Sequence, residues 1–225
     1  MVIWLSFILG LMPALIWLIF FLQEDRDRPE PKGLIFETFI LGAVLVFPAL
    51  YLQVLVTNYI LNPLGSPEFG SLGVVLYSLI EELCKLAPVY FIIRKKAAFN
   101  EPIDAMMYLV IAALGFASVE NVASAISSTN GFELLTLRFI GATLLHVLSS
   151  ALLGFYWGLA MKRREALWHD VPIGLLIATA VHTAFNYLVV IYGADFQVTI
   201  FLATVAFFVF SDFDKLKKQN LEVRN

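Results

Sequence analysis

The sequence predicts an all-α protein that crosses a membrane about seven times. Apolar residues make up 60% of its 225 residues and charged residues only 15%, and the mean hydropathy is +0.83. A soluble domain is nearer half apolar and a quarter charged. Several apolar stretches also reach the ~20 helical residues that cross a hydrocarbon core of ~30 Å. No soluble domain of useful size is left over, so we treat residues 1–225 as one integral-membrane domain.

Seven apolar stretches predict the spans of this helix bundle. The first lacks a basic leading region and a small-residue cleavage site, which indicates a retained helix and not a signal peptide. The second contains Pro48, which predicts a kink or a tilt. The seventh is the shortest, and we expect the charged tail from Ser211 to fray into solvent. The expected spans are roughly Val2–Leu22, Leu34–Leu61, Ser71–Ile93, Ile103–Ile126, Leu134–Met161, Val171–Tyr192 and Phe196–Phe210.

The distribution of basic residues predicts the orientation of the bundle. Lysine and arginine accumulate in the cytoplasmic loops of membrane proteins. With seven spans, thirteen of the fifteen lysines and arginines lie in segments on one side, and the other two, Lys85 and Arg138, lie within spans. We therefore expect the N-terminus outside and the C-terminus inside.

The third span carries an unusual pair of carboxylates, Glu81 and Glu82, in the middle of an apolar run. Ionised groups in hydrocarbon cost a few kcal/mol each and usually have a function. Lys85 follows at helical spacing from both, so either glutamate can pair with it. Because adjacent helical residues point about 100° apart, one glutamate can be a structural partner of the lysine while the other acts as a general base.

Three further spans carry polar residues at a similar depth. At ~1.5 Å of rise per residue, these residues lie between the outer third of the membrane and its midplane. We therefore expect four helices to bring their polar groups into one cavity. The residues are Glu120 and Asn121 on the fourth span, His146 on the fifth, and His182 and Asn186 on the sixth.

Structural roles are the alternative for each of these polar residues. The two glutamates and Lys85 could form a buried ion-pair lock between helices, and the histidines and Asn186 could be interhelical hydrogen-bond donors. Outside the cluster, we expect a structural role for Arg138, which can pair with Glu120 or Glu133. Asp104 is expected to cap or orient the fourth span. The last part of the fifth span contains a Gly-x-x-x-Gly pattern, at Gly154 and Gly158.

Glutamates, two histidines and an asparagine indicate chemistry with activated water. A glutamate would take the proton from water, while histidine and asparagine donate hydrogen bonds to the oxyanion of a cleaved amide. A second possibility is a divalent metal such as zinc, held by Glu81, His146 and His182, although the sequence lacks His-Glu-x-x-His. A third is a proton- or cation-coupled carrier, which the missing internal repeat disfavours. A membrane scaffold is the remaining alternative.

The motifs on these spans resemble the PrsW family of bacterial membrane proteases. They fall on four successive spans in the family's order, within a core of about residues 71–192. The motifs are Glu81-Glu82-x-x-Lys85, Phe116-x-x-x-Glu120-Asn121, His146 and His182-x-x-x-Asn186.

The family is related to the CAAX-type prenyl-protein endopeptidases and bacteriocin-immunity-type membrane proteins, which show Glu-Glu-x-x-x-Arg, Phe-x-x-x-His and His-x-x-x-Asn. Lys85 stands one residue before the place of that arginine, and Glu120 stands at the place of the first histidine. Both departures fit the PrsW family better. The resemblance implies that Glu82 pairs with Lys85.

The resemblance implies a function as well as a fold. It implies the first, site-1, cleavage of a single-span anti-sigma factor on its extracellular side, in the plasma membrane of a bacterium. A second intramembrane protease would then release a sigma factor under envelope stress. The implied partners are this substrate and membrane lipids, without nucleic acid, and no cofactor is implied unless the metal-dependent alternative holds.

Roles for single residues follow from the resemblance by analogy with the wider group. Glu81 would activate water with help from Glu120. His182 and Asn186 would stabilise the oxyanion. His146 has no counterpart in that scheme, and it would position the substrate or bind a metal.

Overall fold

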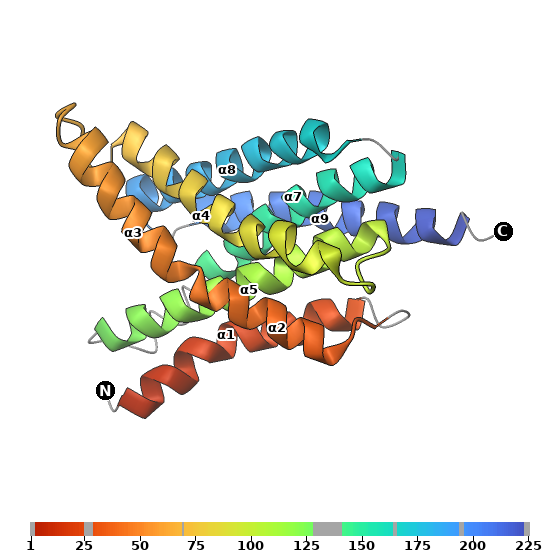
Figure 1. Cartoon of the computed structure of the whole chain (residues 1–225). Helices are drawn as coiled ribbons and strands as arrows, with labels where there is room; N and C mark the ends of the chain where they lie inside the picture. Colours follow the sequence, from red (N-terminus) through yellow and green to blue (C-terminus); the bar gives the residue numbers. More distant parts are fainter. Residues whose placement is uncertain are drawn as a thin grey trace.

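The computed structural model describes residues 3–24, 29–68, 70–127, 141–163, 166–193 and 196–222, and in these ranges it is a bundle of long helices (Figure 1). The all-α prediction is confirmed. The helices are α1 (Ile3–Glu24), α2 (Lys32–Val44), α3 (Val46–Val56), α4 (Ser71–Phe91), α5 (Pro102–Ser127), α7 (Ala142–Arg163), α8 (Leu167–Tyr192) and α9 (Phe196–Glu222), with short π- and 3-10-helical turns at Thr57–Leu61 and Ile93–Lys95.

Six segments of the described chain are long and apolar enough to cross a membrane. They are α1, the continuous stretch Lys32–Leu61, α5, α7, α8 and α9. The helix α4 has 21 residues, but three of them are charged, Glu81, Glu82 and Lys85. It packs against α3, α5 and α8 inside the bundle. With α4 included, the described helices agree with the seven predicted spans.

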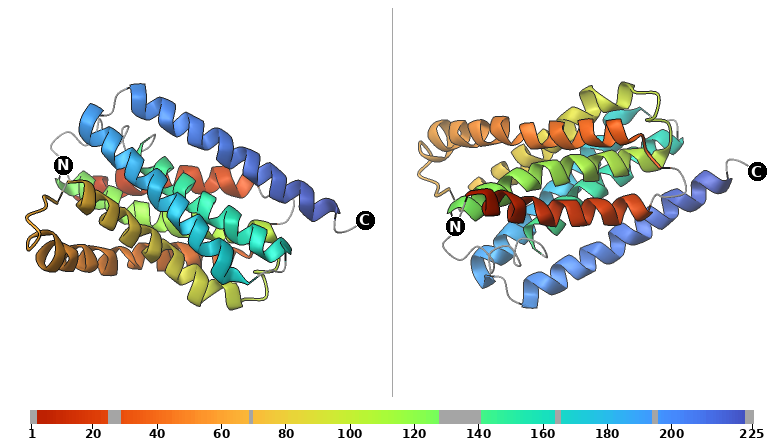
Figure 2. Two further views of the ribbon diagram at one scale, coloured as in Figure 1. Left: turned by 90° about the horizontal axis from the view of Figure 1, so that it is seen from above. Right: turned by 90° about the horizontal axis from the view of Figure 1, so that it is seen from below.

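The order of the helices agrees with an odd number of crossings. Figure 2 shows α1 starting at one end of the bundle and α9 finishing at the other. Within the described ranges, the lysines and arginines other than Lys85 lie at or near helix ends, for example Lys32 at the start of α2, Arg94 just after α4 and Arg163 at the end of α7. Figure 2 shows these helix ends on the side of the bundle where α9 finishes. This asymmetry was expected, but the side of the membrane that the basic end faces stays a prediction.

The second span is interrupted where Pro48 predicted a break. The helix α2 ends at Val44 and α3 begins at Val46, with Leu45 between them. Pro48 has no N–H to donate to the Val44 carbonyl, and its ring crowds that oxygen. The loss of one backbone bond explains the interruption.

The predicted end of the last span is wrong, because α9 continues to Glu222 and, with 27 residues, is the longest described helix. The side chains of Phe213 and Leu216 are 2% and 0% exposed. The Phe213 ring lies 5.5 Å from that of Phe21 on α1. Apolar residues at helical spacing thus continue beyond Phe210, and their burial keeps the helix from fraying.

The helix α5 is the centre of the bundle, packed by α1, α2, α4, α7 and α9. Glycines let its neighbours approach closely. A Cβ on Gly154 would lie 2.4 Å from Met106 Cα, and one on Gly158 would lie 2.5 Å from the Pro102 carbonyl oxygen. Both glycines of the Gly-x-x-x-Gly pattern therefore lie where α7 closely approaches α5. On the other side of α5, a Cβ on Gly115 would lie 2.0 Å from the Phe39 carbonyl oxygen of α2.

Gly115→Ala is therefore expected to push α2 away from α5. Overpacking of this kind costs typically ~1–3 kcal/mol, which outweighs the helix propensity that alanine adds. Thermal unfolding in detergent should show a lower midpoint. The control is Gly33→Ala, because nothing lies within 4 Å of a Cβ at Gly33. Equal midpoints for the two variants would contradict the close contact.

Asp104 caps α5, as predicted. Its Oδ2 accepts hydrogen bonds from the backbone N–H groups of Asn100 at 2.7 Å and Glu101 at 2.6 Å. These two groups precede the helix, which begins at Pro102. Since proline lacks an N–H and is favoured in the first turn of a helix, the local sequence is sufficient to start α5 here.

Candidate active site

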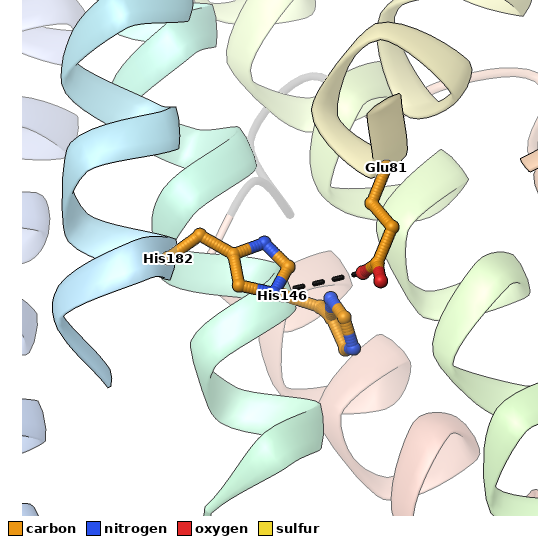
Figure 3. Close-up of side chains that lie close together, drawn as sticks. All are labelled: Glu81, His146 and His182. Carbon is orange, nitrogen blue, oxygen red and sulfur yellow. Dashed lines mark ion pairs between the residues drawn. The ribbon is translucent and has the colours of Figure 1, made fainter. Parts of the chain in front are cut away.

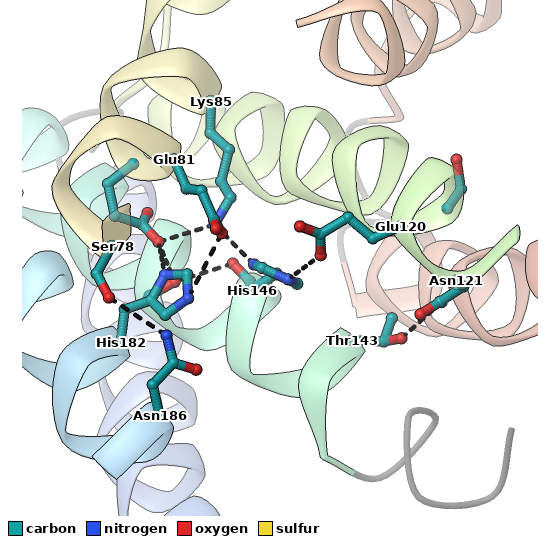
Figure 4. Close-up of polar contacts among 12 residues, drawn as sticks. Ser78, Glu81, Lys85, Glu120, Asn121, Thr143, His146, His182 and Asn186 are labelled. Atoms are coloured by element: carbon teal, nitrogen blue, oxygen red, sulfur yellow. Dashed lines mark hydrogen bonds and ion pairs between the residues drawn. The ribbon is translucent and has the colours of Figure 1, made fainter. Parts of the chain in front are cut away.

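The predicted polar residues on four helices meet in one cluster inside the bundle (Figure 4). Hydrogen bonds and ion pairs join Glu81, Glu82, Lys85, Glu120, His146 and His182 into one network. Asn186 forms a separate contact with Ser78. The contributions are Glu81, Glu82 and Lys85 from α4, Glu120 from α5, His146 from α7, and His182 and Asn186 from α8.

Glu82 is the most completely bonded member of the cluster. Its side chain is 0% exposed. Its Oε1 accepts from Lys85 Nζ at 2.8 Å, His182 Nδ1 at 2.7 Å and Ser149 Oγ at 3.0 Å. Its Oε2 accepts from Ser150 Oγ at 3.4 Å. The expected pairing of Glu82 with Lys85 is confirmed, and these bonds make Glu82 a fixed acceptor that orients His182.

Glu81 is placed differently, although it is the next residue. Its Oε1 accepts from Gln53 Nε2 at 3.1 Å. Its Oε2 is buried without a hydrogen-bond partner, and His182 Nε2 lies 3.5 Å away (Figure 3). Buried polar atoms nearly always have a partner, so an exception calls for an explanation. Glu81 Oε2 is an open acceptor beside a histidine, which is the arrangement that a general base requires.

His146 joins the residues of α4 to Glu120 on α5. Its Nδ1 lies 2.7 Å from Lys85 Nζ, and its Nε2 lies 2.8 Å from Glu120 Oε2. The ring is 3% exposed, and its centroid lies 5.9 Å from that of Phe116. A residue to which the sequence assigned no single role therefore sits between the ammonium of α4 and the carboxylate of α5.

The two asparagines lie in different surroundings. Asn186 Nδ2 donates to Ser78 Oγ at 3.3 Å, one helical turn before the glutamate pair. Asn121 donates to Thr143 Oγ1 at 2.9 Å and thereby joins α5 to α7. Arg138, expected to have a structural role, lies outside the described residues.

Several polar partners in this site were not predicted. Their hydroxyl and amide groups are uncharged, so they carry no strong signal in an apolar helix. Helical spacing could have indicated them, because Ser149 and Ser150 follow His146 by three and four residues, and Ser78 precedes Glu81 by three. Gln53 is the polar residue in the middle of α3.

The fold and the site together define a multi-pass membrane protein with a buried site of carboxylate, imidazole and amide groups, which is suited to hydrolysis. Residues 30–211 match the family described as "PrsW family intramembrane metalloprotease". The chain belongs to this family, and it is a membrane peptidase.

Relatives named "Protease PrsW" occur in several bacteria. The protein of Geobacillus kaustophilus is 33% identical over 164 residues, which are 71% of this chain and 70% of the relative. That of Clostridioides difficile is 28% identical over 222 residues, 94% and 90% of the two chains. That of Bacillus subtilis is 26% identical over 182 residues, 80% of each chain. No solved structure matches the chain.

Proposed function

We propose that this peptidase makes the first cleavage of a membrane-anchored anti-sigma factor, on the extracellular side of a bacterial plasma membrane. The bacterial relatives support the location. The product would be the substrate of a second intramembrane protease, and a sigma factor would finally be released under envelope stress. The observation that carries the catalytic part of this proposal is the open, buried Oε2 of Glu81.

The depth of the site supports a cut near the outer surface. The helix α4 begins at Ser71, at the end of the bundle opposite to the basic residues, and Glu81 follows ten residues later. That separation corresponds to about 15 Å of helix. If the basic end faces the cytoplasm, as the positive-inside rule predicts, the site lies between the middle of the membrane and its outer face.

Glu81 is the proposed general base. Its Oε2 takes a proton from a water molecule, and the water oxygen forms a bond to the scissile carbonyl carbon. The proton moves to the leaving nitrogen when the C–N bond breaks. Glu120 contributes through His146, whose Nε2 it contacts at 2.8 Å.

Asn186 and His182 are the proposed donors to the oxyanion, His182 from Nε2 after that atom has taken the proton that Glu81 accepts from water. Glu82 holds Nδ1 of His182 at 2.7 Å, which directs Nε2 toward Glu81. If the proton passes from Glu81 to Nε2, the ionised Glu82 stabilises the imidazolium, as the aspartate does in a Ser-His-Asp triad. Asn186 adds a second donor. Its hydrogen bond to Ser78 is long, at 3.3 Å, so its amide N–H can donate to the oxyanion instead.

The family description, "metalloprotease", implies a metal ion. The positions of the candidate ligand atoms show whether the side chains could bind one. Glu81, His146 and His182 offer ligand atoms within 4.8 Å of one another. The 3.5 Å between Glu81 Oε2 and His182 Nε2 is close to the spacing of two ligands each ~2 Å from one tetrahedral zinc ion.

The third residue does not fit. Both nitrogens of His146 are in contact with other side chains, Nδ1 with Lys85 and Nε2 with Glu120. A catalytic zinc site needs about three protein ligands, and this set offers two in the present arrangement. We therefore propose a reaction that does not depend on a metal.

A reconstituted cleavage assay tests this function. The purified protein, in lipid, is mixed with a single-span anti-sigma-factor-like substrate, with and without a chelator, and its metal content is measured by mass spectrometry. We expect one cut near the outer end of the substrate span, at the same rate with the chelator. Chelator-sensitive cleavage by protein with stoichiometric metal would favour the metallopeptidase. Proton-dependent uptake into proteoliposomes without cleavage would favour the carrier.

A further inference from the structure

Lys85 is a buried cation with two fixed partners. Its side chain is 0% exposed, and its Nζ lies 2.8 Å from Glu82 Oε1 and 2.7 Å from His146 Nδ1. The ammonium also lies over the Phe116 ring, 5.2 Å from its centroid. Contacts from three helices therefore hold the positive charge against His146.

These contacts determine which nitrogen of His146 carries the proton. A lysine ammonium has three N–H donors and no acceptor, so the nitrogen that faces it, Nδ1, must accept. The ring proton is then on Nε2, and it is donated to Glu120 Oε2 at 2.8 Å. His182 has the opposite arrangement, because its Nδ1 faces the carboxylate of Glu82, which accepts.

The same contacts oppose a metal at His146. A metal ligand needs a free nitrogen lone pair, and the lone pair of Nδ1 is occupied by Lys85. An ion bound at Nδ1 would need the place that the ammonium now holds, 2.7 Å from Nδ1. Even if the ammonium moved to ~4 Å from the ion, repulsion would lower the affinity by roughly 1,000-fold for a unit charge at an effective dielectric constant of 20.

We propose that Lys85 is a positioning residue that fixes His146 as an Nε2–H donor to Glu120 and keeps divalent cations off His146. The buried ammonium then occupies the position in which a metallopeptidase would hold its ion. The tautomer and the metal ligands of His146 can be measured whatever the substrate is.

The first test is the tautomer of each histidine, read from the nitrogen chemical shifts of the protein labelled with 15N-histidine in lipid. The chain has three histidines, and His146→Ala and His169→Ala assign the signals. We expect a neutral ring protonated on Nε2 for His146 and on Nδ1 for His182. Lys85→Arg should keep the His146 signal, because arginine is also only a donor. A native His146 protonated on Nδ1 would overturn the proposal.

The second test is cobalt binding, measured by visible absorption. The test variant is Glu82→Gln with Lys85→Met, because it removes both charges of the ion pair together and the glutamine oxygen can still accept from His182. We expect no cobalt bands for the native protein and affinity at least about 100-fold tighter for the double variant. Adding His146→Ala should remove this affinity. Glu82→Gln alone, which keeps the lysine, is the matched control and should resemble the native protein.

Two results would overturn the exclusion of metals. One is a native protein that binds one equivalent of cobalt through His146. The other is a correctly folded double variant, eluting as the native protein does in size-exclusion chromatography, that binds none. In that case something other than Lys85 would keep the ion away.

Discussion

Glu81→Gln is expected to reduce cleavage by about 10²–10⁴-fold, the usual contribution of a general base. Glutamine has the same shape and can still accept the hydrogen bond from Gln53 through its amide oxygen, but it cannot take a proton from water. The open atom of Glu81, Oε2, is the one that we expect the reaction to use. The measurement is the initial rate of substrate cleavage, with elution and thermal midpoint as checks of folding.

The matched control for this variant is Glu37→Gln. Glu37 lies at the basic end of the bundle, is paired with Lys96 at 3.1 Å, and is 39% exposed. The same chemical change there should leave cleavage unaffected. Full activity of the Glu81 variant would remove this residue from the mechanism, and an equal loss in both variants would show that the effect is not specific to the site.

Lys85→Met alone is expected to destabilise the protein by ~3–5 kcal/mol, because it leaves the Glu82 carboxylate buried without its cation. Combined with Glu82→Gln, the same change should cost much less, because no charge is left uncompensated. For a chain of this length, the difference corresponds to roughly 10 °C in the thermal midpoint. Unfolding of the single and double variants in one detergent measures it.

The outcome also distinguishes two explanations of this ion pair. If the pair is a unit, the double variant is more stable than the sum of the single effects indicates. Additive losses would show that Lys85 and Glu82 act independently, and the contact of Lys85 with His146 would then be the more important one. In either case, the midpoint of Gly33→Ala provides a reference for a neutral substitution.

The sequence alone was sufficient for the class of fold. Apolar runs of about 20 residues have few stable alternatives to helices in hydrocarbon, and Pro48 marked the break between α2 and α3. Where local signals are weak, the prediction was wrong. The charged tail after Phe210 stays helical because Phe213 and Leu216 pack against distant segments, and hydropathy does not contain that information.

The sequence by itself also predicted that ionisable residues of four helices would lie together, because such groups are costly in apolar helices and their depth follows from helical rise. It did not predict their hydroxyl and amide partners, and it could not assign the roles of the ionisable residues. Glu81 and Glu82 are neighbours of the same type, and only the tertiary structure shows that three helices fill the bonds of Glu82 while Oε2 of Glu81 stays open. The tautomer of His146 likewise depends on Lys85 and Glu120, which the fold places at its two ring nitrogens. Hydrogen-bond partners across a bundle depend on how the helices rotate and pack, and the spacing of residues along one chain does not specify that.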